Sequence, residues 1–366
     1  MDPATTFCPN MACPARGQTG QGNMGIHSGK DKRFLCTACR KTFSATQGTA
    51  FYRLRTAAET VSVVGTLLAQ GCPLHAIVVA VGSDERTGAG WVARAGAQGQ
   101  AVQEQLVEQP RDLGQVQADE SRVKKQGGLV WMALAIMVCT RLWLGGAVSA
   151  QRDRPLIRRL SERVRRWAAH RPLLVCPDGL VSSLRAVRER CRDPVHTGTG
   201  GRPRLRPWRH VLIAHVVKRS ERRRVVETAR RIVAGTPARV ETLRRRSQGD
   251  GGIKTAYMER LHATVRARLA SLTRRGRARA RRTLTLQHGL SLIGTGSNFC
   301  TPHASLPPIR GGTTPALAAG ITDQCWTVQA WLSFPVPPSR WTPPTQRGRP
   351  SHALKRLMAR WCGDHG

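Results

Sequence analysis

Hydrophobic positions change their spacing several times along the chain, and these changes divide it into four zones. Residues 51–110 carry apolar side chains at helical spacing, interrupted by Gly and Pro. Residues 113–306 alternate short apolar runs with longer helical patterns, and residues 307–366 are rich in Pro, which predicts an irregular tail. Residues 1–50 show little periodicity and are rich in Cys, Gly and basic residues. We therefore expect this first zone to take its stability from something other than a hydrophobic core.

The second zone, residues 51–110, predicts three helices separated by tight turns. These helices cover residues 57–69, 74–81 and 84–91. Gly and Pro end the first two helices, and Asp84 can cap the third. The layout is typical of a helix-turn-helix DNA-binding module. Gly88 and Gly90 fall inside the third helix and lower its helix propensity by about 1 kcal/mol each.

The third zone, residues 113–306, predicts a sheet flanked by helices. Its expected strands are residues 113–119, 129–139, 142–149, 172–176 and 210–217. Its expected helices are residues 153–169, a segment ending near 191, 222–234, and 255 to about 282. The order is therefore three strands, helix, strand, helix, strand, helix. An antiparallel meander followed by α/β alternation predicts an α/β fold with a ribonuclease-H-like mixed sheet.

Four cysteines in the first zone have the spacing of a zinc site. Cys8, Cys13, Cys36 and Cys39 follow the pattern C-x4-C-x22-C-x2-C, which is two short knuckles separated by a hairpin-length insert. Four unrelated thiols are the alternative interpretation. The spacing favours a closed, structural Zn²⁺ site, which supplies the folding energy that a segment without a core lacks. We therefore expect residues 1–50 to form a zinc ribbon.

The charge of the chain points to a polyanionic partner. The sequence has 59 basic and 22 acidic side chains, a net charge of +37, which repels itself in a folded chain unless an anion neutralises it. Nucleic acid is the first candidate, and an anionic membrane surface is the second. The longest apolar run, residues 129–139, is too short to span a membrane, and residues 1–10 lack the features of a signal peptide. We therefore expect a cytoplasmic protein without membrane association.

Some of these basic residues are candidates for contacts with DNA phosphates. A solvated basic surface is the alternative for any single one of them, but so many like charges on one helix favour a bound anion. The candidates are Arg33, Arg40 and Lys41 in the Cys-rich zone, and Arg266, Arg268, Arg274 and Arg275 on the helix that follows Glu259.

Three acidic residues stand out against the basic background. Asp119 lies in the first predicted strand of the third zone, Asp178 follows the fourth strand, and Glu259 lies in the first turn of a helix. The first and fourth strands are neighbours in a ribonuclease-H-like order, so the two aspartates can meet and the glutamate helix can complete a cluster. Oxygen ligands select Mg²⁺ or Mn²⁺, and two such ions would assist both the attacking and the leaving oxygen of a phosphoryl transfer.

Each of these carboxylates also has a simpler interpretation. Glu120 adjoins Asp119, but successive strand residues face opposite ways, and Asp119 shares its face with Gln117, so we predict Asp119 as the ligand. Asp178 fits an ordinary Pro-Asp-Gly turn, and Glu259 fits a surface partner on an Arg-rich helix. Taken together in this strand order, the three residues favour a metal site.

Four stretches of the chain resemble bacterial insertion-sequence transposases. They are residues 116–120 (VQADE), 178–180 (DGL), 255–269 (TAYMERLHATVRARL) and 298–306 (NFCTPHASL). The similarity is to the insertion-sequence-one type, which joins a zinc ribbon and a helix-turn-helix to a ribonuclease-H-like core with an Asp-Asp-Glu (DDE) triad. It runs from about residue 8 to residue 320. The chain departs from the family pattern at His262, where these proteins usually carry Asn, and at Gly88 and Gly90 in the recognition helix.

The resemblance implies a DNA transposase whose catalytic metal ligands are Asp119, Asp178 and Glu259. It also implies that Arg260 and Arg266 contact the DNA backbone near the active site. Such an enzyme nicks the ends of its element with water as the nucleophile, and the freed 3′-hydroxyl attacks a target phosphodiester. The implied partners are double-stranded terminal inverted repeats, target DNA and further copies of the chain on that DNA, in the bacterial nucleoid. A catalytically inactive zinc-dependent DNA-binding protein from a decayed element is the alternative, and a basic RNA-binding protein is a more distant one.

Overall fold

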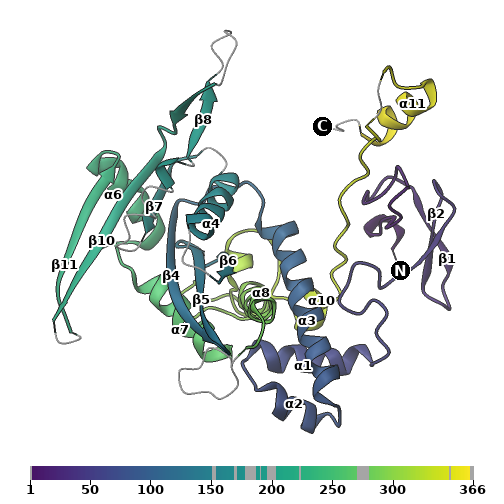
Figure 1. The fold of residues 1–366 in the computed structure, drawn as a ribbon, viewed down its shortest axis with the longest axis horizontal. Helices are drawn as coiled ribbons and strands as arrows, with labels where there is room; N and C mark the ends of the chain where they lie inside the picture. The colour runs from purple at the N-terminus through teal and green to yellow at the C-terminus, as the bar shows by residue number, and fades with distance from the viewer. Residues whose placement is uncertain are drawn as a thin grey trace. The chain divides into compact units, whose positions relative to one another are not determined.

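The computed structural model places most of the chain in two compact units. The described residues are 2–150, 154–168, 171–177, 187–189, 191–195, 203–221, 224–269, 280–345 and 348–362. One unit combines Met1–Ala58 with Leu332–Gly366, and the other comprises Glu59–Trp331 (Figure 1). The smaller unit therefore draws on two segments that are far apart in the sequence.

The smaller unit is built on a three-stranded antiparallel sheet. A short 3-10 helix, η1, covers Pro3–Thr5. The strands lie in the order β1-β2-β3 and cover Met24–Ser28, Arg33–Cys36 and Thr42–Ser44. Phe34 on the central strand is buried, and it packs in one cluster with three of the four predicted zinc ligands.

The C-terminal segment contributes to the same core. Helix α11 spans His352–Trp361, and Ser351 caps it by accepting a backbone hydrogen bond from its first turn. Trp361 is buried in the same hydrophobic cluster as Phe34, and its carbonyl accepts a hydrogen bond from Gln18 Nε2 at 2.7 Å. The segment predicted to be an irregular tail therefore contains an ordered helix, because Ser351 supplies an N-cap and Trp361 an apolar anchor.

Three helices lie at the start of the larger unit. They are α1 (Ala58–Ala69), α2 (Leu74–Ala80) and α3 (Glu85–Val102), and a π-helical turn, η2 (Gln103–Val107), follows them. The first two match the predicted helices. Asp84 caps the third as predicted, accepting a hydrogen bond from Thr87 N–H at 2.9 Å.

Helix α3 runs well beyond its predicted end at residue 91, because it packs against α8 (Thr283–Phe299). Gly96 lies so close to α8 that a Cβ there would stand 2.6 Å from the Cα of His288. Gly88 likewise lets α3 approach α2, since a Cβ at this position would clash with Val78. Gly88, which lowers helix propensity, therefore occupies a position where a larger residue would force side chains of α2 to shift.

The core of the larger unit is a mixed six-stranded sheet flanked by helices. Its strand order is β11-β10-β7-β4-β5-β6. The strands cover Gln115–Lys125 (β4), Gly128–Met137 (β5), Trp143–Ser149 (β6), Leu173–Pro177 (β7), Val211–Glu221 (β10) and Arg224–Ala234 (β11). A separate two-stranded sheet pairs Arg192–Val195 (β8) with Arg204–Pro207 (β9). The predicted α/β class with a mixed sheet is confirmed.

The first and fourth strands of this zone are neighbours, as the sequence predicted. β4 pairs with β7 in parallel, and the register sets Ala118 opposite Pro177. β7 in turn pairs in parallel with β10, whereas β4, β5 and β6 form an antiparallel meander. Asp119 is therefore one residue beyond the last pair of the β4–β7 ladder.

The prediction of a helix over residues 222–234 is wrong. Residues 224–234 form β11, which pairs antiparallel with β10 along most of its length. The segment is rich in β-branched Val, Thr and Ile, whose side chains pack well on a pleated strand and lose χ1 freedom in a helix. Pairing with β10 also satisfies the backbone groups of β11 that face β10, and this tertiary contact overrides its helical spacing.

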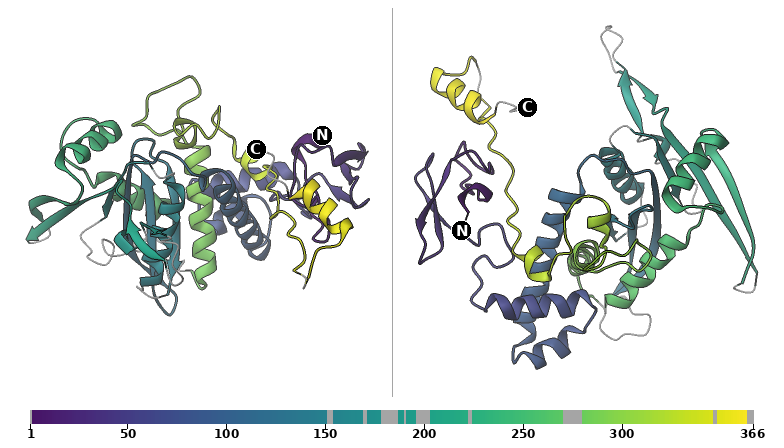
Figure 2. Two further views of the ribbon diagram at one scale, coloured as in Figure 1. Left: turned by 90° about the horizontal axis from the view of Figure 1, so that it is seen from above. Right: turned by 180° about the vertical axis from the view of Figure 1, so that it is seen from behind.

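Helices cover both faces of the sheet. α4 (Arg154–Trp167) packs on one face and matches the predicted helix. The other face carries α6 (Pro237–Gln248), α7 (Ala256–Arg268) and α8, and Figure 2 shows α8 between the sheet and α3. Two short helices, α9 (Pro315–Ala318) and α10 (Val328–Leu332), follow.

Helix α7 is shorter than the predicted helix of residues 255 to about 282. It ends at Arg268, because Leu269 has an extended backbone. Among the described residues, no helix is long and apolar enough to cross a membrane.

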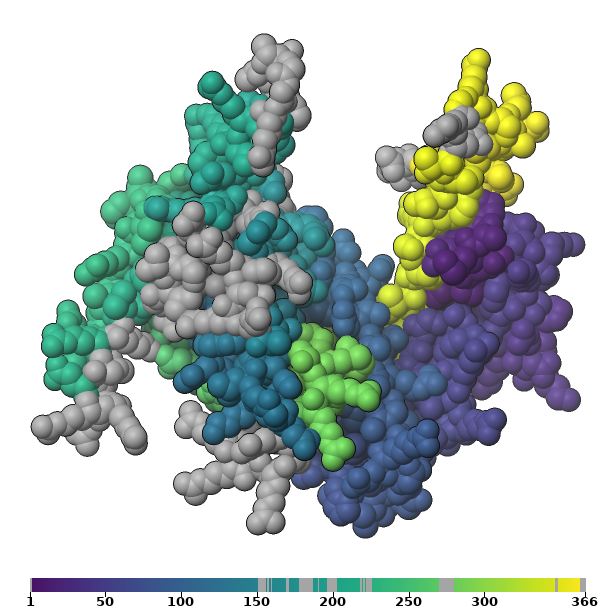
Figure 3. Space-filling view, in the orientation of Figure 1, coloured from purple at the N-terminus to yellow at the C-terminus, as the bar shows by residue number. Residues whose placement is uncertain are grey.

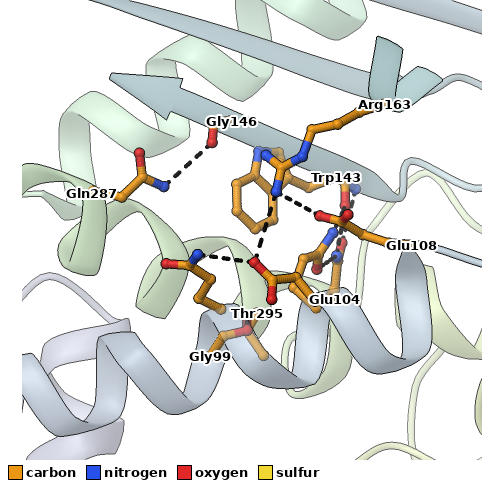
Figure 4. A network of polar contacts seen from close by, with 11 residues as sticks. Gly99, Glu104, Glu108, Trp143, Gly146, Arg163, Gln287 and Thr295 are labelled. Atoms are coloured by element: carbon orange, nitrogen blue, oxygen red, sulfur yellow. Dashed lines mark hydrogen bonds and ion pairs between the residues drawn. The ribbon is translucent and has the colours of Figure 1, made fainter. Parts of the chain in front are cut away.

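The β6 edge of the sheet is sealed by side-chain amides from α8. Asn298 Oδ1 accepts a hydrogen bond from Trp143 N–H at 2.8 Å, and Asn298 Nδ2 donates to the Trp143 carbonyl at 2.8 Å. Gln287, on the same helix, bonds to β6 in the same way. Its Nε2 donates to the Gly146 carbonyl at 3.3 Å (Figure 4), and its Oε1 accepts from the Val148 N–H at 3.2 Å. These contacts occupy backbone groups that another strand would otherwise pair with.

Candidate functional site

Four cysteine thiols converge in the smaller unit. The sulfur atoms of Cys8, Cys13, Cys36 and Cys39 all lie within 4.8 Å of one another. The Cys8–Cys39 pair is separated by 3.6 Å and the Cys13–Cys36 pair by 3.9 Å. A tetrahedral zinc ion with Zn–S bonds of about 2.3 Å would separate its sulfurs by roughly 3.8 Å. The cluster predicted from the spacing is therefore confirmed as a set that can hold a metal ion such as zinc.

Two backbone turns present these thiols. The Gly17 N–H donates to the Cys8 carbonyl at 3.0 Å, which closes the first knuckle. The Arg40 N–H donates to the Cys36 carbonyl at 2.8 Å, which closes the second, and Arg40 adopts a left-handed φ of 60° there. In the folded unit these two turns present the sulfurs of both knuckles to one point.

The thiols of the cluster differ in acidity. Burial raises the pKa of Cys13 to about 12 and also raises that of Cys8. Burial acts in the same direction at Cys39, but hydrogen bonds from the Lys41 backbone, the Asn10 side chain and neighbouring thiols outweigh it and lower the pKa to about 7. A metal ion would therefore displace protons from the buried thiols as it binds.

The three basic residues predicted to bind phosphate on this unit differ in availability. Arg33 donates from Nη2 to the Thr42 carbonyl at 3.2 Å and to the Thr42 hydroxyl at 2.7 Å, so it ties β2 to β3. Arg40 and Lys41 are exposed beside the second knuckle. The two exposed residues are the better candidates for contact with an anion.

Asp119 lies near the middle of β4 and faces α7. On the same face, Gln117 Nε2 donates to the Lys254 carbonyl just before that helix. Glu120 points the other way, where it lines a small cavity with Leu160 of α4. The alternation expected of a strand therefore separates the two carboxylates as predicted, with Asp119 on the side of the helix that carries Glu259.

His262 is the side chain through which α7 reaches Asp119. Its Nε2 lies 3.1 Å from Asp119 Oδ2, and its Nδ1 lies 3.4 Å from the Ser121 hydroxyl. His262 is buried, whereas the Asp119 side chain is 27% exposed. Asp119 Oδ1 also accepts the Glu120 N–H at 2.6 Å. The sequence revealed His262 only as a departure from a family pattern, since a single histidine carries no spacing signal.

The other two predicted carboxylates are Glu259 and Asp178. Glu259 lies one turn before His262 on α7; it is exposed and accepts a hydrogen bond from the Thr255 hydroxyl at 3.1 Å. Asp178 lies outside the described residues. Within the described parts of the chain, the four cysteines are the only group of three or more potential metal ligands with this close spacing.

The basic residues predicted around Glu259 also fall into groups. Arg260 is exposed, and Arg266 is half-buried. Arg268 donates to the Ser297 hydroxyl at 3.3 Å, and burial lowers its pKa. Arg274 and Arg275 lie outside the described residues. Among the described members of this set, Arg260 is therefore the most open to a ligand.

Arg141, which the sequence did not single out, adds to this cationic surface. It lies in the turn between β5 and β6 with a left-handed φ of 61°, and its guanidinium stands 4.2 Å from the ring centre of Tyr257 on α7. Burial, Arg141 and Arg260 together lower the pKa of His303. Three basic side chains thus gather at the N-terminal end of α7, which favours anions.

A further polar network lies where α3, α4 and α8 meet β6. Arg163 Nη2 lies 2.7 Å from Glu108 Oε1 and 4.0 Å from Glu104 Oε1 (Figure 4). Burial raises the pKa of Glu108, and the charge of Arg163 opposes that rise. Both residues line a cavity of about 330 Å³. The pairing offsets the charge of the largely buried Glu108 carboxylate. No local sequence pattern predicts it, because the partners come from different elements.

Comparison with protein-family models and with curated proteins finds no match for this chain.

Proposed function

We propose that the chain is a metal-dependent DNA transposase that cleaves element ends and transfers strands, with Asp119, Asp178 and Glu259 as its catalytic carboxylates. The observation that carries the proposal is the convergence of three elements. β4 carries Asp119, its parallel neighbour β7 ends at the residue before Asp178, and α7 carries Glu259 and contacts Asp119 through His262. The strand order β6-β5-β4-β7-β10 supports a ribonuclease-H-like core.

The charge distribution supports double-stranded DNA as the partner. The net charge of +37 needs an anion, and each phosphate that a protein neutralises releases counterions. Arg141, Arg260 and His303 would contact the backbone near the catalytic carboxylates. The four-cysteine unit and helices α1–α3 would bind the terminal inverted repeats, with copies of the chain assembled on the two ends.

The described carboxylates suit Mg²⁺ or Mn²⁺. Asp119 is held in place by the Glu120 N–H and keeps part of its carboxylate exposed, and the Thr255 hydroxyl orients Glu259. Two bound ions would supply an activated attacking oxygen and a stabilised leaving oxygen. Asp119, Asp178 and Glu259 would hold those ions through oxygen atoms, which hard divalent cations prefer.

Cleavage of DNA that includes the sequences flanking the gene tests the proposal. With Mg²⁺ present, Asp119→Asn, Asp178→Asn and Glu259→Gln should each lower cleavage and strand transfer by about two orders of magnitude or more, while DNA binding stays unchanged. Glu120→Gln is the matched control, because this carboxylate faces the opposite side of β4, and it should keep its activity. Wild-type cleavage by all three of the first variants would refute the assignment.

A catalytically inactive DNA-binding protein is the second candidate, and one observation favours it. His262 Nε2 lies 3.1 Å from an oxygen that a metal ion would need. If His262 competes with the metal, the wild type should show no Mn²⁺ binding that depends on Asp119, and His262→Asn should restore it. Mn²⁺ binding by the wild type that is lost in Asp119→Asn would instead support the enzyme.

A further inference from the structure

The two edges of the six-stranded sheet differ in how much of their outward-facing backbone is hydrogen-bonded. The β6 edge is occupied by the amides of Asn298 and Gln287. β11 forms the opposite edge and pairs with β10 on one side only (Figure 1). Among the described residues, one side chain from outside this hairpin bonds to the β11 backbone: Arg188 Nη2 donates to the Val233 carbonyl at 3.0 Å, near the end of the strand. An open strand of this length is a template for pairing with another strand.

The surface of β11 carries exposed apolar side chains next to unpaired charges. Val226 is 54% exposed and Ile232 is 42% exposed. Glu227 and Arg231, which lie between them, are exposed and have no ion-pair partner in the described part of the chain. The hairpin stands at the molecular surface in Figure 3. A partner that covers β11 would have to match this combination of apolar and charged positions.

The sequence of β11 matches itself when it is reversed about Ala229. Antiparallel pairing with a second copy, centred on that residue, sets Glu227 opposite Arg231 and Val226 opposite Ile232. Because the two copies are equivalent, each of these pairs occurs twice. A centre at residue 228 would instead oppose Val226 to an arginine, and a centre at residue 230 would oppose Glu227 to a valine. Residue 229 is therefore the centre that joins opposite charges and apolar side chains together.

We propose that β11 is a self-association surface, on which a second copy of this chain extends the sheet by antiparallel pairing centred on Ala229. The ladder between β10 and β11 is regular from Glu227 to Ile232 and shifts register on either side, so the regular part contains the Glu227–Arg231 contact and Val226 lies just outside it. The pairing is isologous, as a twofold dimer requires. It needs neither DNA nor the catalytic carboxylates, so it stands independently of the proposed function.

Charge-swap variants of the full chain test this register by analytical ultracentrifugation without DNA. Glu227→Arg places like charges opposite each other twice, and so does Arg231→Glu, so each variant alone should dimerise roughly tenfold or more weakly than the wild type. Mixing the two variants restores opposite charges at both contacts, so heterodimers should form. The double variant E227R/R231E should dimerise as the wild type does.

Arg204→Glu is the control, because it makes the same charge change at an exposed position on β9, outside the large sheet, and it should leave dimerisation unchanged. Circular dichroism of every variant confirms that the hairpin still folds. A monomeric wild type at micromolar concentration would overturn the proposal, as would a dimer that tolerates both single swaps. If the mixture of the two variants does not form heterodimers, the dimer uses another surface. If the single variants change only the affinity for DNA, β11 lies in a DNA-binding groove. Both outcomes contradict the proposal.

Discussion

Replacement of Asn298 by Leu should destabilise the larger unit strongly, because this buried amide is bonded on three sides. It accepts from Trp143 N–H at 2.8 Å, donates to the Trp143 carbonyl at 2.8 Å, and donates to Gln103 Oε1 at 3.3 Å. Asn298 is only 1% exposed, so water cannot replace it. The Trp143 carbonyl would keep one partner, since Gln103 Nε2 also donates to it at 3.1 Å. The Trp143 N–H would keep none of its described bonds.

The expected loss of unfolding free energy in Asn298→Leu follows from these hydrogen bonds. An orphaned buried N–H costs about 1–3 kcal/mol, and each further hydrogen bond lost costs about 1 kcal/mol. The added apolar surface of Leu offsets part of this loss, so we expect a net cost of about 2–4 kcal/mol. Gln287→Leu is the matched control on the same helix. Its bonds are longer, at 3.2 and 3.3 Å, and it is only half-buried, so it should cost about 1 kcal/mol or less.

Urea unfolding followed by circular dichroism measures both changes, read from the midpoint at a constant denaturant slope. Hydrogen exchange at the Trp143 amide provides a second, local measurement. If Asn298→Leu costs no more than Gln287→Leu, or if the Trp143 amide stays as protected as in the wild type, the role given to this amide is refuted.

Three further predictions follow from contacts described above. Gly96→Ala should destabilise the larger unit by about 1–3 kcal/mol in urea, because the new methyl group meets the backbone of His288; a neutral effect would contradict the close approach of α3 and α8. Arg163→Met should leave Glu108 as an unpaired buried charge. Burial raises the folded pKa of Glu108 above its unfolded value, so the stability of the folded state falls as pH rises past the unfolded pKa. The loss of stability in Arg163→Met relative to the wild type, measured by thermal melts, should therefore shrink in acid. A loss that is independent of pH would refute this. Zinc affinity of the cysteine cluster, measured by competition with a chromophoric chelator, should rise with pH and be lost in Cys13→Ser, because the buried thiols bind as thiolates; an affinity independent of pH would exclude thiolate ligation.

The sequence predicted those parts of the fold that depend on local pattern. Helical spacing located α1, α2 and α4, and apolar runs located five of the six strands of the large sheet. The cysteine spacing predicted the four-thiol cluster, because two knuckles close together in sequence need only one hairpin to meet. Alternation along β4 correctly separated Asp119 from Glu120.

The parts that depend on tertiary contacts were not predictable in this way. Residues 224–234 carry both a helical spacing and a β-branched composition, and pairing with β10 decides between them. The continuation of α3 past residue 91 depends on the close fit of Gly96 against α8. His262 acquires its place beside Asp119 only when α7 lies across β4, and nothing in its neighbours along the chain indicates that contact.

The division of the smaller unit between Met1–Ala58 and Leu332–Gly366 has a consequence for synthesis. The cysteines leave the ribosome first, but Trp361, which completes their core, leaves it last. At about 5–20 residues per second, the stretch from Cys39 to Trp361 separates these events by roughly 15–60 s. During that interval the nascent chain exposes four thiols and an unfinished apolar surface, so early metal capture would protect them. A message cut short before Trp361 would yield a product whose first domain can never finish folding.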